Sequence, residues 1–600
     1  MSGPRTAANT TGGCFRMIAV GLLAGMISAC GEQPRTAVTA PSSPPSISDT
    51  TITAAAVPTP NAGSRPETVT AAGHYLAARQ ALYFNDVGQS ATFFLDTLEA
   101  ESDNIPLLRQ AFLTQYYYGD IERAAALGRQ LESLDVVVPL GREPGTALAI
   151  RKADWAATLI LADKIAEDGT SMVLAGIIRG WSLVAAGRGD AGISALLEAG
   201  RLAVNRDDGM PPYFRLHAAL MAEHLGLTAE AEQRVNGLDT KLQGAHLLLQ
   251  LAAFHARRGN WEAVDGIIST RLSGQFNHRL VRAALEGQAS TLPGPHRMIA
   301  DAVVAMALAE RDNESGQSIT ARLRFSLFID PGNEFTRLLL AQQMADFGQN
   351  EKALATLGRI PLDGVYGQLA RLTEASVIEE QGDAQNAIDR LQQVVEMDPE
   401  NASLHQRLGD IHRRHSQFRQ SRDAYMAALD LGSDSGGLHR SLGVSLERLG
   451  ETGAAETHLL RAIEIDPSDA YALNYLGYWW ADEGRNLDEA VAMIERAVIQ
   501  RPDSGFFVDS LGWVHFRLGD AVTAVGYLER ATELEPSDPE ITGHLGDVYW
   551  VLDRRDEARF KWRLALSLSD DEAEQKMLSD RLENGLPASE IPKSRLPATD

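Results

Sequence analysis

The sequence is poor in cysteine and lacks the short motifs typical of enzymes. Its 600 residues contain two cysteines, Cys14 and Cys30, so no thiol follows position 30. Thiol catalysis and cysteine-based zinc sites are therefore excluded from nearly the whole chain. There is also no Gly-x-x-x-x-Gly-Lys loop, no His-Glu-x-x-His pair and no Gly-x-Ser-x-Gly elbow. We expect a protein that is not an enzyme and that uses no cofactor and no small-molecule substrate.

Positive charge is also in short supply. The chain has 55 lysines and arginines against 80 aspartates and glutamates, for a net charge of −25. Nucleic-acid binding requires a basic face, so nucleic acid is not an expected partner. Broad contact with an anionic membrane surface is disfavoured for the same reason. The excess of carboxylates also keeps a long chain soluble. The expected partners are other proteins.

Histidines cluster once, but the cluster is a poor metal site. His405, His412 and His415 lie close to Asp410 in the sequence, and one helical face presents two of them. Two arginines stand between His412 and His415, and their charge disfavours a bound cation. We therefore expect no metal, and histidines that are solvated or packed.

Alternation of polar and apolar residues, the mark of strands, is absent over any long run. Instead, five prolines keep a regular spacing with intervals of 68, 68, 35 and 34 residues. They are Pro331, Pro399, Pro467, Pro502 and Pro536. Because proline lacks an N–H group and restricts the residue before it, each is expected to end a helix.

A Leu-Gly step shares the period of about 34 residues. Its five copies are Leu408-Gly409, Leu442-Gly443, Leu476-Gly477, Leu511-Gly512 and Leu545-Gly546. A glycine at this place lets the second helix of a pair lie close against the first. The pattern resembles the tetratricopeptide repeat, a stacked pair of helices. The resemblance implies an all-α, right-handed solenoid of about twelve to fourteen helix pairs. Well-matched repeats are expected over 401–570, divergent repeats over 68–400, and a capping helix with a flexible tail over 571–600.

The N-terminus has the features of a bacterial lipoprotein signal peptide over residues 1–29. An apolar run of 13 residues, Met17 to Ala29, is too short to span a bilayer but fits a secretory signal. It leads into Ile27-Ser28-Ala29-Cys30, which resembles a lipobox and implies acylation of Cys30. An ordinary signal peptide or a mitochondrial presequence stays open as an alternative.

Residues 30–67 are expected to form a disordered tether behind the lipid. They contain seven prolines, with many serines, threonines and alanines, and too few large apolar side chains to fold. Gly31, rather than aspartate, follows Cys30, which in bacterial lipoproteins implies sorting to the outer membrane. The expected location is the bacterial cell envelope, with the chain anchored through Cys30 and facing the periplasm.

The first helix of each pair lines the inner groove in tetratricopeptide arrays, and this resemblance selects the candidate binding residues. They are Arg413, Arg414, Arg440, Arg448, Asn474, Tyr478, Asp509, Trp513, Phe516, Arg517, Asp547 and Trp550. Aromatic and arginine side chains dominate interface energetics. The four rings are expected to form an apolar stripe beside a basic patch, although some of them alternatively pack between helices. On this hypothesis, Trp513→Ala with Trp550→Ala removes partner binding and leaves the helical circular dichroism unchanged.

One resemblance goes beyond the repeat itself. The stretches LNYLGY at 473–478, DSLGW at 509–513 and HLGDVYW at 544–550 are similar to the C-terminal repeats of LbcA-like lipoproteins of proteobacteria. Those proteins, like the shorter NlpI-like lipoproteins, are adaptors for carboxyl-terminal processing proteases. The resemblance implies an adaptor that brings such a periplasmic protease to cell-wall hydrolases. The alternative is a structural assembly factor of an outer-membrane secretion, pilus or polysaccharide-export complex.

Overall fold

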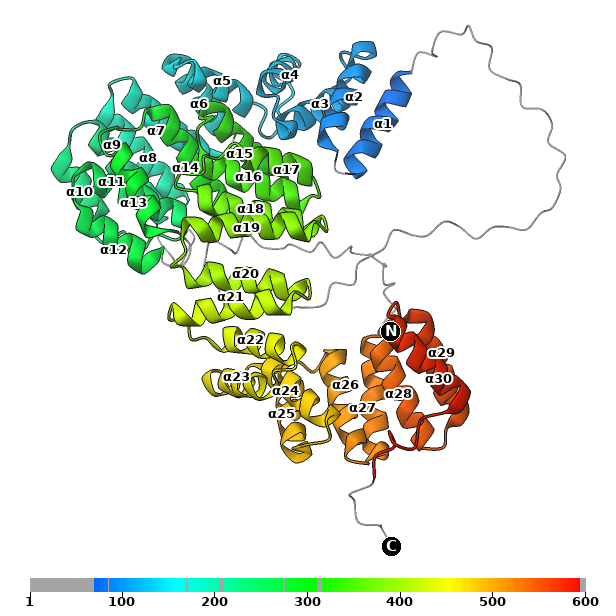
Figure 1. Cartoon of the computed structure of the whole chain (residues 1–600). Coiled ribbons are helices and arrows are strands. Elements are labelled where there is room, and N and C mark those ends of the chain that lie inside the picture. Colours follow the sequence, from blue (N-terminus) through cyan, green and yellow to red (C-terminus); the bar gives the residue numbers. More distant parts are fainter. Residues whose placement is uncertain are drawn as a thin grey trace, which may run out of the picture. The chain divides into compact units, whose positions relative to one another are not determined.

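The protein is built from helices alone in the part that its structure describes (Figure 1). The computed structural model describes residues 70–84, 86–168, 171–203, 210–272, 276–309 and 316–593. These residues form thirty α-helices and no strand, which confirms the all-α fold. The proposed signal peptide, Cys30, the tether and residues 594–600 lie outside the described residues. No helix among the described ones has the length and apolar character needed to cross a bilayer.

The helices fall into two compact units, which meet in the sequence after Asp383. The helices of unit 1 are α1 (Ala71–Tyr83), α2 (Val87–Ala100), α3 (Ile105–Tyr118), α4 (Ile121–Ser133), α5 (Glu143–Arg151), α6 (Trp155–Glu167), α7 (Met172–Ala185), α8 (Gly189–Leu202), α9 (Pro212–His224), α10 (Thr228–Val235), α11 (Ala245–Arg257), α12 (Trp261–Arg271), α13 (His278–Gln288), α14 (Pro295–Ala309), α15 (Gly316–Ile329), α16 (Glu334–Asp346), α17 (Asn350–Leu357) and α18 (Gly367–Glu380). Those of unit 2 are α19 (Ala384–Met397), α20 (Ala402–Arg414), α21 (Phe418–Asp430), α22 (Gly436–Arg448), α23 (Thr452–Ile465), α24 (Ala470–Asp482), α25 (Leu487–Gln500), α26 (Gly505–Arg517), α27 (Ala521–Leu534), α28 (Pro539–Val551), α29 (Arg555–Leu568) and α30 (Glu572–Asn584).

The regularly spaced prolines end helices as predicted. Each of the five lies two residues beyond the last residue of a helix, namely α15, α19, α23, α25 and α27. The turns inside the pairs are equally well marked. Gly450 and Gly519 take the left-handed conformation, with φ of 76° and 83°, which closes the preceding helix at little steric cost. Asp520 then caps α27 by accepting a hydrogen bond from the N–H of Thr523.

The Leu-Gly glycines permit close helix packing, which confirms their predicted role. A Cβ atom added to any of the five would lie 2.5–2.7 Å from a side-chain atom of the second helix in the pair. At Gly512 the neighbour is Leu528, and at Gly546 it is Trp562. The two helices of each of these pairs therefore approach more closely than any larger residue permits.

Replacing two glycines of one helix pair by alanine should change the free energy of unfolding in opposite directions. Gly512→Ala places a methyl group 2.7 Å from the Leu528 side chain, so we expect a loss of about 1–3 kcal/mol of unfolding free energy. Gly526 lies inside the neighbouring helix α27 with no atom within 4 Å of an added Cβ. Gly526→Ala should therefore gain up to about 1 kcal/mol from helix propensity. Urea unfolding followed by circular dichroism measures both, and a gain for Gly512→Ala would refute the packing role.

Unit 2 is a regular stack. Five helix pairs follow one another from α20 to α29, and each second helix packs on the first helix of the next pair. Neighbouring first helices also touch, as α24 and α28 both do with α26. The first helices thus share one face, and α30 packs on α29 at the end of the stack. This arrangement brings side chains from α24, α26, α28 and α30 together.

Unit 1 departs from a uniform stack. Its described residues form eight helix pairs, which with the five of unit 2 make thirteen, within the predicted range. After the unpaired α13, however, the chain turns back: α14 packs against α7 and α9, and α15 packs against α3, α4 and α5. Helix α14 is apolar nearly all round, with ten buried residues, as expected of a helix enclosed by others. The first helices of the early repeats are therefore covered by a later part of the same chain.

Candidate protein-binding site

A pocket of about 730 Å³ lies where α24, α26, α28 and α30 converge in unit 2. We call it the acidic pocket. It is lined by Asp482, Trp513, Phe516, Arg517, Asp538, Pro539, Glu540, Gly543, His544, Asp547, Asp571, Ala573, Glu574, Met577, Arg581 and Glu590. Four of the residues predicted from the sequence are among them: Trp513, Phe516, Arg517 and Asp547. Two more predicted residues, Tyr478 and Asp509, contact His544 in its wall.

Aromatic side chains form part of the pocket's wall. The ring of Trp513 stacks on that of His544, with centroids 4.0 Å apart, and lies 5.1 Å from the ring of Phe516. Trp513 is 7% exposed and Phe516 is 1% exposed. The indole N–H of Trp513 has no acceptor among the described residues. A buried donor without a partner costs free energy, so an incoming acceptor would be favoured there.

Two buried charge pairs support the pocket. The His544 imidazole lies 3.0 Å from the Asp509 carboxylate. Burial disfavours the charged imidazole, but Asp509 outweighs it and raises the pKa of His544 to about 9. Asp547 accepts a hydrogen bond of 2.8 Å from the Trp562 indole and lies 2.9 Å from the guanidinium of Arg581. Burial raises the pKa of Asp547 to about 6 in spite of that guanidinium.

The rim of the pocket is strongly acidic. Seven of its lining residues are carboxylates, against two guanidiniums and His544. Asp547 and Glu590 form ion pairs with Arg581, whereas the other five carboxylates form none with any described residue. Glu540 instead accepts a hydrogen bond of 2.8 Å from the Tyr478 hydroxyl. Burial, followed by the charge of Glu540, raises the pKa of Tyr478 far above its usual range, so this hydroxyl stays a donor.

The expected basic patch is largely paired within the protein. Arg440 lies 3.1 Å from Asp469, and Arg448 lies 3.6 Å from Glu447. Arg413 contacts the Tyr425 hydroxyl at 3.3 Å. None of the four arginines of this patch lines the acidic pocket, and neither does Asn474. Their contact with a partner stays a prediction, but the charge of the pocket itself is opposite to that of the expected patch.

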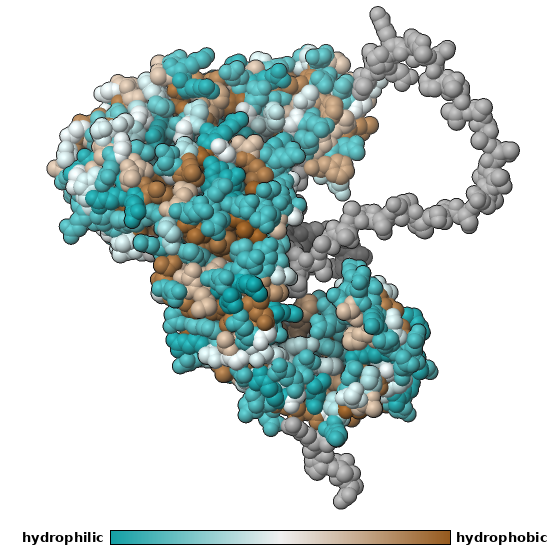
Figure 2. Space-filling view, viewed as in Figure 1, coloured by the Kyte–Doolittle hydropathy of each residue, from teal (hydrophilic) through white to brown (hydrophobic). Residues whose placement is uncertain are grey.

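The expected apolar stripe is not an open surface. Trp550 packs against Trp562, with ring centroids 5.2 Å apart, and its ring fills the space beside Gly585. Trp513 and Phe516 are buried as well. Replacing Trp513 and Trp550 by alanine would therefore remove packing along with any partner contact, which makes it a poor test of binding. On the face of unit 2 seen in Figure 2, hydrophilic residues predominate, with apolar residues between them, and single exposed apolar residues are normal on a protein surface.

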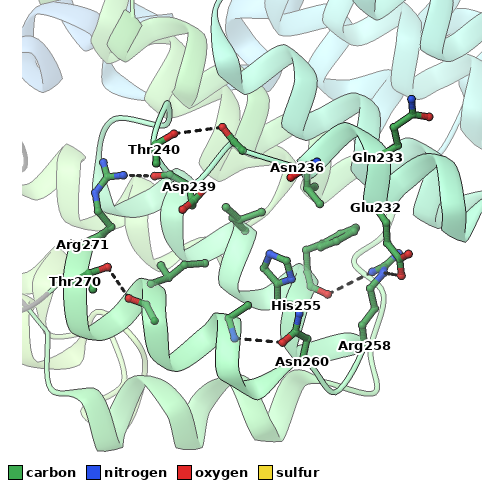
Figure 3. A pocket seen from close by; sticks show the side chains of 17 residues that line it. Glu232, Gln233, Asn236, Asp239, Thr240, His255, Arg258, Asn260, Thr270 and Arg271 are labelled. Carbon is green, nitrogen blue, oxygen red and sulfur yellow. Dashed lines mark hydrogen bonds and ion pairs between the residues drawn. The ribbon is translucent and has the colours of Figure 1, made fainter.

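A second pocket, of about 780 Å³, lies in unit 1 and was not predicted from the sequence (Figure 3). It lies between α10 and α12, over α11, where α10 is only eight residues long. Most of its polar groups are satisfied internally. Arg271 donates to the carbonyls of Asp239 and Leu242, and Arg258 lies 3.6 Å from the Phe254 ring centroid while pairing with Glu223. This pocket therefore offers a ligand fewer unsatisfied groups than the acidic pocket does.

Comparison with known proteins agrees with the repeat architecture. Residues 300–451 match the tetratricopeptide repeat-like domain, and residues 440–505 and 510–570 match the tetratricopeptide repeat. The TPR repeat-containing protein PA4667 of Pseudomonas aeruginosa is 36% identical over 101 residues, which are 17% of each chain. The tetratricopeptide repeat-containing protein trd-1 of Caenorhabditis elegans is 27% identical over 34% of this chain and 24% of its own. The chain thus spans a quarter or less of the length of these relatives.

Solved structures with similar folds include the Cut9 and Hcn1 hetero-tetramer, at 15% identity and a TM-score of 0.36, covering 86% of this chain and 96% of that one. MamA has 24% identity and a TM-score of 0.25, covering 27% of this chain and 94% of its own. The matches to the tetratricopeptide repeat thus lie within residues 300–570, where the structure also has paired helices, and repeats of this kind are typical of protein-interaction scaffolds.

Proposed function

We propose that the acidic pocket is the place where this scaffold holds a segment of a partner protein. The observation that carries the proposal is the convergence of three first helices and α30 on one pocket of about 730 Å³. Its volume suits a few side chains of an extended or helical segment. The unpaired indole N–H of Trp513 and the rim carboxylates that form no ion pair offer that segment specific polar contacts.

Gly543 provides a direct test, because it lines the pocket and has free space beside it. An added Cβ would meet a single atom within 4 Å, the Leu578 Cδ2 atom at 3.6 Å. Gly543→Arg should fill the pocket while improving helix propensity by up to about 1 kcal/mol. Gly543→Ala is the matched control, since it makes the same backbone change and leaves the pocket open.

Partners crosslinked to the wild-type chain in cells would first be identified by mass spectrometry and purified. Calorimetry should then show that Gly543→Arg weakens binding by about a hundredfold or more, whereas Gly543→Ala changes it little. Thermal unfolding should show both variants at least as stable as the wild type. Equal affinity of the arginine and wild-type chains would reject the acidic pocket as the binding site.

The proposed setting is the bacterial envelope, with the chain anchored through acylated Cys30 and facing the periplasm. The lipobox-like sequence supports this, as do the proline-rich residues that follow it. Several acyl chains give stable anchoring, at about 0.8 kcal/mol per buried CH₂. We expect the wild-type protein to sediment with membranes and Cys30→Ser to move to the soluble fraction. Soluble wild-type protein without bound lipid would contradict the anchor.

Within that setting, the adaptor for a carboxyl-terminal processing protease is the proposed role, supported by the resemblance of residues 473–550 to LbcA-like repeats. The crosslinked partners decide between this role and the assembly factor. A serine-type processing protease recovered together with cell-wall hydrolases supports the adaptor. A β-barrel or a secretin in a stable stoichiometric complex supports the assembly factor instead.

A further inference from the structure

We propose that the segment held in the acidic pocket is cationic, and that its lysine or arginine side chains pair with the carboxylates of the rim. This inference rests on the proposed function and adds the chemistry of the partner. It begins from the charge of the pocket: seven carboxylates face two guanidiniums and one protonated imidazole, an excess of four negative charges. A partner of like charge would meet repulsion there, and a cationic one would be attracted and oriented.

The five carboxylates that lack a cation are Asp482, Asp538, Glu540, Asp571 and Glu574. Asp482, Glu540 and Asp571 are exposed, and Asp538 and Glu574 are half-buried. One oxygen of Asp538 and one of Asp571 accept the N–H group that each of them caps, and one oxygen of Glu540 and one of Glu574 accept a hydroxyl. The second oxygen of each forms no hydrogen bond with a described residue, and neither oxygen of Asp482 forms one, so these oxygens remain open to a ligand. The five carboxylates come from α24, from the start of α28 and from the start of α30, which places them around the pocket rather than along one helix. An arrangement of this kind can surround a side chain that enters from solvent.

The chain itself shows which ligand these carboxylates accept. Arg581 of α30 reaches into the pocket, is 8% exposed, and pairs with Asp547 and Glu590 at 2.9 Å each. A guanidinium therefore already forms an ion pair with the most buried carboxylate of the site. The rim presents further carboxylates that have no cationic partner among the described residues. A lysine or arginine side chain from a second protein could form ion pairs with them in the same way.

The indole of Trp513 adds an observation that is independent of charge. Its N–H group is buried and has no acceptor among the described residues, and Trp513 is one of the residues that line the pocket. A peptide carbonyl is the commonest acceptor a protein partner offers. Cationic side chains paired with the rim and a main-chain carbonyl at Trp513 together describe a polypeptide segment.

The experiment uses the purified full-length chain and fluorescein-labelled peptides in which alanine alternates with lysine, arginine or glutamate. The pocket variant is Asp482→Asn with Glu540→Gln, two exposed positions where loss of folding is not expected. The control, Glu495→Gln with Glu533→Gln, removes the same charge from exposed sites on α25 and α27 outside the pocket. Fluorescence anisotropy at 50 and 200 mM salt gives each affinity.

We expect the lysine and arginine peptides to bind, the glutamate peptide not to bind, and the pocket variant to lose about tenfold in affinity while the control loses less than twofold. Higher salt should weaken the wild-type complex. Equal losses in both variants would mean general attraction to an acidic protein and would overturn the inference, as would preference for glutamate. If Gly543→Arg abolishes capture of the natural partner but the pocket variant does not, the binding site stands and the cationic partner is wrong.

Discussion

Replacing Trp562 by alanine should destabilise the C-terminal repeats by about 3–5 kcal/mol, the largest loss we expect from one substitution in unit 2. Trp562 is fully buried on α29, and its ring lies where a Cβ on Gly546 would come within 2.5 Å. It also packs on Trp550 and donates the hydrogen bond to Asp547. Alanine leaves both a cavity and a buried carboxylate with one donor fewer, and each is costly.

Phe560→Ala is the matched control for that experiment. Phe560 lies on the same helix but is 59% exposed, so its loss should cost little. Because repeat arrays do not always unfold in one step, hydrogen exchange of α28 and α29 should accompany urea unfolding. Similar losses for the two variants would show that Trp562 is not a central packing residue.

The repeats of unit 2 were predictable because their signals are local. The Leu-Gly glycines act on the helix that follows within the same pair, and the prolines act on the residue beside them. Each signal recurs at one period, so an array of paired helices follows from spacing alone. The tight turns at Gly450 and Gly519 are local in the same way.

The packing of α14 and α15 against the early helices of unit 1 could not be predicted from spacing, because it depends on contacts between distant parts of the chain. The Arg322 side chain, for example, contacts Ser171 at 3.3 Å, and the Arg151 guanidinium lies 4.5 Å from the Phe328 ring centroid. No period links these residues. One signal was available in the sequence: residues 298–309 are apolar apart from Asp301, which indicates a helix surrounded by others.

Only those residues of the acidic pocket that lie on the first helices of the repeats could be predicted from the sequence. Counting from the Leu-Gly step found Trp513, Phe516 and Asp547 on the first helices. It could not find Arg581 or Glu590, because α30 lies beyond the last Leu-Gly step. The internal pairing of the basic patch was not predictable for a related reason. Arginines can be counted in a sequence, but the pairing of Arg440 with Asp469, on the next repeat, needs the folded structure.

Stability should fall as pH rises from 7 to 9, through deprotonation of His544. The folded-state pKa of about 9 exceeds the ordinary value of 6.5, because Asp509 stabilises the imidazolium more than burial disfavours it. A raised pKa means that protonation favours the folded state. The stabilisation is therefore complete below about pH 6.5 and is lost as pH rises through 9. Over this window we expect a loss of about 2 kcal/mol.

The variant Asp509→Asn isolates this effect, since it keeps the shape of the partner and removes its charge. Glu540 and Asp547 also act on His544, and the pKa of Asp547, about 6, lies below the window. Urea unfolding at pH 7, 8 and 9 should show a steep decline in the wild type and a shallower one in Asp509→Asn. Parallel declines would assign the pH dependence to other groups. A decline confined to the wild type would show that the wall of the acidic pocket carries a positive charge at neutral pH, directly beneath the carboxylates of its rim.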